Sequence, residues 1–194
     1  MNLKTNNGLK ITLIIVAILL IISIPIVGSY NKLVNLEQQV NNAESNIDTQ
    51  LQRRSDLIPN LVSTVKGYAS QEKDIFTDIA NARSKLSGAT NVQDQANADS
   101  ELSNALSRLL VIVERYPDLK SNQNFKDLSI QLEGTENRIA VARQDYNTAV
   151  TNYNTKRRRF PTTIIASMFG FEEKPLYKAS ANAADVPSVD FSQK

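Results

Sequence analysis

The sequence contains no cysteine, no histidine and no tryptophan, and these absences exclude several kinds of chemistry. Without cysteine, the chain can form no disulfide and cannot be attached to lipid as a lipoprotein. Without histidine, it lacks the ligands of Glu-x-x-His di-metal sites, of ordinary zinc catalysis and of histidine-based triads. The six glycines never cluster into a phosphate-binding loop. We therefore expect no enzyme activity, no catalytic residue, no metal and no cofactor.

The composition is that of a helical protein. Aromatic residues make up 6% of the 194 residues, and glycine and proline number six each. About 140 residues follow the apolar N-terminal segment, enough for one domain with a real core. The formal net charge of +2 does not indicate a nucleic-acid partner.

An uncharged apolar run, ITLIIVAILLIISIPIV, occupies residues 11–27. No charged residue stands between Lys10 and Lys32. A helix of about 20 residues spans roughly 30 Å, the thickness of the hydrocarbon core of a bilayer. The run therefore predicts a single-pass transmembrane anchor within residues 1–29, and the lipid bilayer as a partner.

The flanks of this run bear on cleavage and orientation. A cleaved signal peptide is the alternative, but residues 27–29 match a small-residue cleavage site poorly. Lys4 and Lys10 precede the run and Lys32 follows it closely. The positive-inside rule thus favours a cytoplasmic N-terminus, with the remaining chain outside the cell membrane.

After the anchor, apolar residues recur at the three- and four-residue spacing of buried helix faces. The pattern predicts an all-α fold: an N-terminal transmembrane helix followed by an antiparallel bundle of about four long helices over residues 30–171. Ser55 and Asp56 suit the start of a second helix, with Pro59 in its first turn. Gly88 and Pro117 mark the ends of the second and third helices. Ser121 or Asn122 can cap the fourth.

Four stretches of the chain, taken in order, carry the pattern of a known protein family. The first runs from Tyr30 to Tyr68 and contains RRSDLIPNLV, in which Arg53, Arg54, Asp56, Pro59 and Asn60 carry the pattern. The others are ERYPDLKSNQNF at residues 114–125, LEGTENRIAVARQDYNTAVTNYN at 132–154 and FPTTIIASMFGF at 160–171. The four stretches resemble the LemA family of bacterial membrane proteins and follow one another in the family's order. The resemblance implies a single-pass membrane protein with an antiparallel helical bundle. It implies no reaction, substrate or catalytic residue.

A basic cluster followed by an apolar segment is the candidate membrane-surface contact. If four helices alternate in direction, the last one ends beside the membrane, where basic and apolar side chains suit lipid headgroups. The alternative is that the cations complement the end of the helix and the apolar segment packs on the bundle. The residues concerned are Lys156, Arg157, Arg158, Arg159, Phe160, Ile164, Ile165, Phe169 and Phe171.

Two other polar groups have both a functional and a structural interpretation. Arg53 and Arg54 can contact a protein partner, or interact with the last carbonyl groups of the first helix. Tyrosines and asparagines at 146–147 and 153–154 can line a ligand groove, or the tyrosines can be core residues with bonded hydroxyl groups. The polar residues 172–194 predict a disordered tail.

Two function classes are compatible with these observations. The first is a membrane-anchored scaffold of the bacterial cell envelope that binds an unidentified protein or a second copy of itself. The second is a membrane-surface binding or remodelling protein that uses the anchor together with residues 156–171. Neither class involves catalysis.

Overall fold

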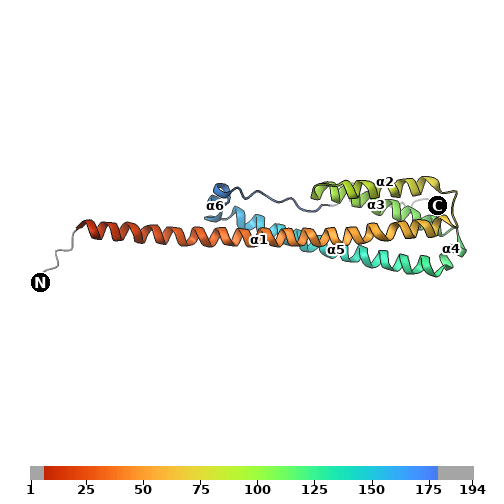
Figure 1. Cartoon of the computed structure of the whole chain (residues 1–194), viewed down its shortest axis with the longest axis horizontal. Helices are drawn as coiled ribbons and strands as arrows, with labels where there is room; N and C mark the ends of the chain where they lie inside the picture. Colours follow the sequence, from red (N-terminus) through yellow and green to blue (C-terminus); the bar gives the residue numbers. More distant parts are fainter. Residues whose placement is uncertain (1–6, 179–194) are drawn as a thin grey trace, which may run out of the picture. The chain divides into compact units, whose positions relative to one another are not determined.

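The computed structural model describes residues 7–178, apart from the side chains of residues 7 and 18–22. This part of the chain contains six α-helices and no β-strand (Figure 1). The helices are α1 (Asn7–Lys66), α2 (Lys73–Gly88), α3 (Val92–Val113), α4 (Pro117–Ser121), α5 (Gln123–Arg158) and α6 (Thr162–Phe169). The predicted all-α fold is confirmed.

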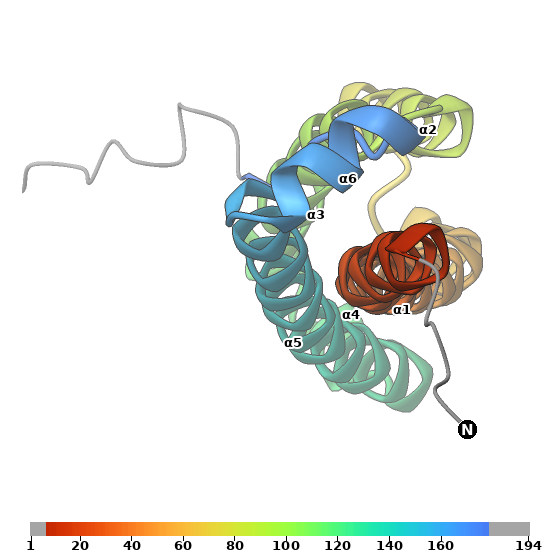
Figure 2. The same ribbon diagram turned by 90° about the vertical axis from the view of Figure 1, so that its left-hand side faces the viewer.

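The chain divides into two compact units, and α1 and α5 each contribute to both. One unit comprises residues 1–42 and 148–174, and the other comprises residues 43–147 and 175–194. The larger unit contains the hairpin of α2 and α3, which lie side by side in both ribbon views (Figures 1 and 2).

The core of the larger unit is built from apolar residues at helical spacing on four helices. Full burial of one such side chain contributes about 1.5–3 kcal/mol, so this row of contacts is what holds the bundle together. Deeply buried members on these four helices include Ile47, Ile58, Leu61 and Val65 of α1, Ile79 of α2, Leu102 and Leu109 of α3, and Ile139 of α5.

The smaller unit has its own core, in which α1 packs with the end of α5 and with α6. Its buried residues include Leu33, Leu36, Val40, Val150, Tyr153, Ile165, Ala166 and Phe171. The Tyr30 ring meets the Phe169 and Phe171 rings edge-on, at centroid distances of 4.9 and 5.6 Å. The predicted apolar stripe of the first helix therefore continues into this core.

The predicted helix break near residue 55 is wrong, because α1 continues to Lys66. Pro59 lacks an N–H group, so the carbonyl oxygen of Ser55 has no partner within the helix. Arg83 of α2 supplies the missing donor: its Nε lies 3.1 Å from the Ser55 carbonyl oxygen and 2.9 Å from the Ser55 hydroxyl oxygen. The tertiary contact thus replaces the hydrogen bond that proline removes.

This replacement predicts a stability loss on changing Arg83. Arg83→Met keeps the long side chain but leaves a part-buried carbonyl without a donor, which costs about 1–3 kcal/mol. We expect that decrease in the free energy of unfolding by urea denaturation. Arg108→Met is the control, because Arg108 forms an exposed ion pair with Asp78 that is worth at most about 1 kcal/mol. Equal losses in both variants would contradict the role assigned to Arg83.

Helix boundaries elsewhere agree with the sequence in part. Gly88 ends α2, and the Asn122 side chain accepts a hydrogen bond from the Phe125 N–H at the start of α5, as predicted. The residues that follow Gly88 are largely polar, yet α3 begins at Val92. Asn91 explains this start, since its side chain caps the Asp94 N–H at 2.9 Å.

The two ends of the described chain bear on two further predictions. Among residues whose side chains are described, no helix is both long and apolar enough to cross a bilayer. The predicted anchor at residues 11–27 lies partly outside that set, because it includes residues 18–22. At the other end, residues 171–177 form hydrogen bonds with α5, and the disorder of the tail stays a prediction. Residues 179–194 are outside the described part.

Candidate functional site

The candidate membrane-surface segment divides into a buried and an exposed face. Ile165 and Phe171 are buried in the protein, at 4% and 9% exposure. Phe160, Ile164 and Met168 follow one another at four-residue spacing, and their side chains are 80%, 50% and 70% exposed. Phe169 is exposed as well. Phe160, just before α6, and Ile164 and Met168 of α6 therefore form a row of exposed large apolar side chains, and Phe169 beside them contacts Tyr30 of α1.

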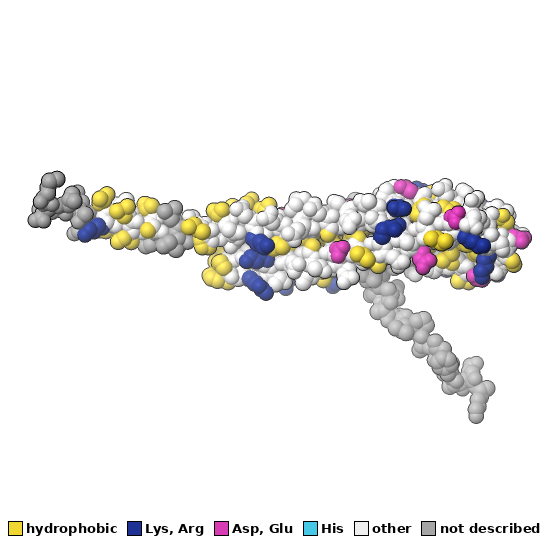
Figure 3. Space-filling model, turned by 90° about the horizontal axis from the view of Figure 1, so that it is seen from below, with side chains coloured by type: hydrophobic (Ala, Val, Ile, Leu, Met, Phe, Trp, Pro, Cys, Tyr) yellow, Lys and Arg dark blue, Asp and Glu magenta, His cyan; other side chains and the backbone are white. Residues whose placement is uncertain are grey.

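The basic residues before this row fall into two that bind other parts of the protein and two that have no acidic partner among the described residues. Arg157 donates from Nε to the Phe171 carbonyl oxygen at 2.7 Å, and Arg158 forms a two-pronged ion pair with Glu173 at 2.7 and 2.8 Å. For Lys156 and Arg159, the described residues provide no such acidic partner. Figure 3 shows basic and hydrophobic side chains next to each other where α5 ends and α6 begins.

A cluster of charged side chains is buried inside the larger unit. Asp99 of α3 is fully buried, and its two oxygen atoms pair with arginines from different helices. Arg54 Nη1 lies 2.8 Å from Asp99 Oδ1 and 2.8 Å from Glu136 Oε2. Arg143 Nη2 pairs with Asp99 Oδ2, which also accepts a hydrogen bond from the Tyr177 hydroxyl at 3.3 Å. Two cations and two anions thus neutralise one another.

The electrostatics of the cluster are set by burial. Burial lowers the pKa of Arg54, and the attraction of Glu136 and then of Tyr177 opposes that decrease. Burial raises the pKa of the Tyr177 hydroxyl, and Arg143 and Arg54 act in the opposite direction. Tyr177 therefore remains a neutral hydrogen-bond donor to Asp99 at neutral pH. The cluster joins α1, α3 and α5 to the C-terminal segment, and no group suited to hold a metal occurs among the described residues.

The C-terminal segment, residues 171–177, runs along α5, and we refer to it as the strap. In the smaller unit, the Tyr153 hydroxyl donates to the Glu172 carbonyl oxygen at 2.8 Å. The Asn154 side-chain amide donates to the Lys174 carbonyl oxygen at 2.8 Å and accepts from the Lys174 N–H at 3.1 Å. Lys174 also forms an ion pair with Glu37 of α1 at 2.9 Å.

The larger unit repeats this arrangement with the preceding tyrosine–asparagine pair. The Tyr146 hydroxyl donates to the Pro175 carbonyl oxygen at 3.0 Å. The Asn147 amide donates to the Tyr177 carbonyl oxygen at 3.0 Å and accepts from the Tyr177 N–H at 2.8 Å. Burial raises the pKa of Tyr146 to about 12, with a further contribution from Glu44, so its hydroxyl stays a donor. We refer to these two pairs as the Tyr-Asn ladder.

The spacing of the ladder matches the geometry of an extended chain. Seven helical residues separate Asn147 from Asn154, a rise of about 10.5 Å. Three extended residues separate Lys174 from Tyr177, a length of about 10 Å. Each asparagine therefore meets one backbone N–H and C=O pair in turn. The structural interpretation of the tyrosines is realised, because both are buried with bonded hydroxyl groups.

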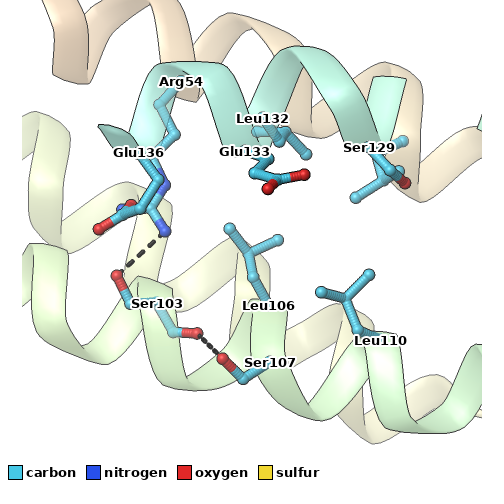
Figure 4. Close-up of a pocket in the computed structure, with 10 residues that line it drawn as sticks. Arg54, Ser103, Leu106, Ser107, Leu110, Ser129, Leu132, Glu133 and Glu136 are labelled. Carbon is cyan, nitrogen blue, oxygen red and sulfur yellow. Dashed lines mark hydrogen bonds and ion pairs between the residues drawn. The ribbon is translucent and has the colours of Figure 1, made fainter. Parts of the chain in front are cut away.

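A cavity of about 440 Å³ lies between α1, α3 and α5 of the larger unit (Figure 4). One end is polar, where Arg54 reaches Glu136 and donates to the Ser103 hydroxyl at 3.0 Å. The walls are formed mainly by Leu61, Leu106, Leu110 and Leu132. Glu133 and Glu136 both line the cavity, but Arg54 neutralises Glu136. These two carboxylates therefore do not form an acid–base pair of the kind that hydrolases use.

Comparison with known proteins identifies the family of the chain. A family model described as "LemA family" matches residues 43–191, which is more than half of the sequence. The chain belongs to the LemA family. The resemblance of its motifs is thereby confirmed.

Several LemA-family relatives carry curated names. Magnetosome protein MamQ 2 of Paramagnetospirillum magneticum is 27% identical, over 82% of this chain and 68% of that protein. Magnetosome protein MamQ of Magnetospirillum gryphiswaldense is 26% identical over the same shares. Protein LemA of Metamycoplasma hominis is 26% identical, over 79% of this chain and 71% of that protein. None of these names describes a reaction.

In this LemA-family chain, motif residues far apart in the sequence meet at the buried charge cluster. Arg54 comes from the first motif, and Glu136 and Arg143 come from the later one. Of the two arginines predicted for partner contact, Arg54 is 4% exposed and fully engaged, so Arg53 alone of the pair has an exposed side chain. Arg54 therefore stabilises the bundle from within.

Two members of the cluster were not anticipated from the sequence. Asp99 stands three residues after Ala96 and three before Leu102, both buried, so its spacing alone places a charge on a core face. The spacing of Asp99 therefore indicated a core position, but most of the residues around it are polar and hide this pattern. Tyr177 gave no comparable signal, since it follows a proline-containing polar segment without helical periodicity.

Proposed function

We propose that this LemA-family protein is a non-catalytic helical scaffold held at the bacterial cell membrane, and that α6 rests against the lipid surface. In this proposal residues 11–27 anchor the chain, with the N-terminus on the cytoplasmic side as Lys4 and Lys10 favour. The bundle then presents surfaces, including Arg53, to a protein partner outside. The observation that supports lipid contact best is the exposed row Phe160, Ile164 and Met168.

The physical argument for lipid contact combines apolar area and charge. Large apolar side chains that stay exposed side by side, and are flanked by basic residues, are typical of interfacial helices. Lys156 and Arg159 lie next to the row, and each basic residue near an anionic surface contributes about 1 kcal/mol. The magnetosome named for two relatives is a further reason to look for this protein at a membrane.

The absence of tryptophan allows a direct test with the full chain in vesicles. Met168→Trp introduces a single tryptophan at an exposed position of α6, and Ile130→Trp places one at an exposed position of α5 in the larger unit. In vesicles containing anionic lipids with brominated acyl chains, we expect the fluorescence at position 168 to be quenched several-fold more strongly than at position 130.

The charge contribution is tested in the same preparation. Replacing Lys156 and Arg159 by Gln should weaken the quenching at position 168 in anionic vesicles and leave neutral vesicles unaffected. The matched control replaces Lys85 and Arg108, basic residues of α2 and α3, by Gln. Equal, weak quenching at positions 168 and 130 would show that α6 does not touch lipid, and would remove this part of the proposal.

A further inference from the structure

We propose that the cavity between α1, α3 and α5 binds a small aliphatic amine, a molecule with one primary ammonium group and an apolar body. The cavity has a volume of about 440 Å³, within the range of roughly 300–1,000 Å³ that is typical of small-molecule sites. Its lining is mainly apolar with a few polar groups, which is also typical of such sites. This inference goes beyond the proposed lipid contact and does not depend on it.

Serines at inward positions explain why this part of the larger unit contains a cavity. Ser103 and Ser107 of α3 and Ser129 of α5 line it. On α3 itself, Leu102 and Leu109 are fully buried and fill the core. Protein interiors are close-packed, so a serine leaves space at a position where a leucine would fill it.

The charge of the cavity favours a cationic ligand. Three ionised side chains line it, Arg54, Glu133 and Glu136, so their formal charges of +1, −1 and −1 sum to −1. Arg54 is 4% exposed and already pairs with Asp99 and Glu136. An anionic ligand therefore finds no free cation in the cavity and meets two carboxylates, whereas an ammonium group is attracted by them.

Two groups on one face of α5 lack partners and suit the ammonium group. The Glu133 carboxylate forms no ion pair with a described residue, and the buried hydroxyl oxygen of Ser129 has no hydrogen-bond partner among them. The two residues lie four positions apart, so their side chains are neighbours on the helix surface, beside the cavity (Figure 4). An ammonium group has three N–H donors and can bond to both. It thereby removes the free-energy cost of the buried, unpaired hydroxyl group.

Four leucines provide the surface for the apolar body of the ligand. They come from all three helices around the cavity: Leu61 of α1, Leu106 and Leu110 of α3, and Leu132 of α5 (Figure 4). Leu110 is 48% exposed, so an alkyl chain that packs beside it removes apolar surface of both molecules from water. The site therefore selects a ligand by an aliphatic chain and a positive charge together.

Modification of a cysteine placed in the cavity tests the proposal with the full chain in non-ionic detergent, because the sequence contains no other cysteine. Ser107→Cys places the thiol in the cavity lining, and Ser84→Cys places one at an exposed position of α2 as the control. The rate of reaction with a small neutral methanethiosulfonate reagent is measured with hexylamine, hexanol or hexanoate at equal concentrations. These probes have similar alkyl chains, but at neutral pH the first is a cation and the last an anion.

We expect hexylamine to slow the reaction at position 107 several-fold, hexanol to slow it less, and hexanoate to leave it unchanged. None of the three should affect position 84. Glu133→Gln should remove most of the protection by hexylamine, because the ammonium group loses its anion. Glu101→Gln is the matched control, since Glu101 is a glutamate of α3 that pairs with Lys85 and does not line the cavity.

Three results would overturn the proposal. The first is that hexylamine gives no protection at position 107. The second is equal protection by all three probes, which indicates apolar binding without recognition of charge. The third is protection by hexylamine that persists unchanged in the Glu133→Gln variant.

Discussion

Replacing Asp99 by Ala should lower the free energy of unfolding by about 3–5 kcal/mol, because it leaves buried arginine without its counter-ion. Asp99 has no exposed surface, and Arg54 beside it is 4% exposed. The remaining anion, Glu136, has a side chain that is 42% exposed and can neutralise only part of this charge. The loss is measured by urea denaturation of the purified protein in detergent.

Asp78→Ala is the matched control for this prediction. Asp78 also pairs with an arginine at 2.8 Å, but both side chains are largely exposed, so the loss should stay below about 1 kcal/mol. A second comparison separates charge from packing. Changing Asp99 to Leu together with Arg54 and Arg143 to Met leaves only Glu136 of the cluster, whose side chain is 42% exposed, and it should restore much of the stability that Asp99→Ala loses. Losses of the same size for Asp99→Ala and Asp78→Ala would contradict the assigned role of the cluster.

The second large effect is expected at the strap. Replacing both Asn147 and Asn154 by Ala removes four hydrogen bonds to its backbone. At about 0.5–1 kcal/mol each, these bonds sum to about 2–4 kcal/mol, so their loss raises the population of released strap by roughly 30- to 700-fold. A glutamyl endopeptidase should then cleave after Glu172 and Glu173 faster by a similar factor, since cleavage follows the population of the open form.

The control is a pair of asparagines with exposed side chains elsewhere on the bundle. Replacing Asn104 and Asn124 by Ala should leave cleavage at Glu172 and Glu173 unchanged. The measurement is the rate at which the C-terminal fragment appears under native conditions. If the ladder variant is cleaved no faster than this control, the asparagines do not hold the strap.

Periodicity was sufficient to predict the helical fold and most of its core. The apolar stripes of α1 and α5, from Leu33 to Leu51 and from Ile139 to Tyr153, are buried as their spacing indicates. The capping role of Asn122 followed from the same local rules. These features depend on residues close in the sequence, so a single chain contains the information needed to predict them.

The errors arose where a distant residue changes the outcome of a local rule. Pro59 would end a helix in isolation, but Arg83 satisfies the carbonyl group that proline leaves free. The residues after Glu172 have no helical pattern of their own, but the Tyr-Asn ladder binds their backbone. The sequence predicted a surface position for Arg54, because its partner Asp99 belongs to another helix. In each case the partner lies about 20 or more residues away in the sequence, so the local pattern cannot predict the contact.

The hydrogen bond from Arg83 to the Ser55 carbonyl oxygen has a consequence for the order in which the protein folds during synthesis. During synthesis, the residues of α1 leave the ribosome before Arg83 does, so the gap at Ser55 is at first filled by water. The carbonyl oxygen of Ser55 gains its protein hydrogen-bond donor only when α2 has emerged and packed against α1. The longest helix of this protein is therefore finished by a later part of the chain, and we expect the nascent bundle to gain its cooperativity at that step.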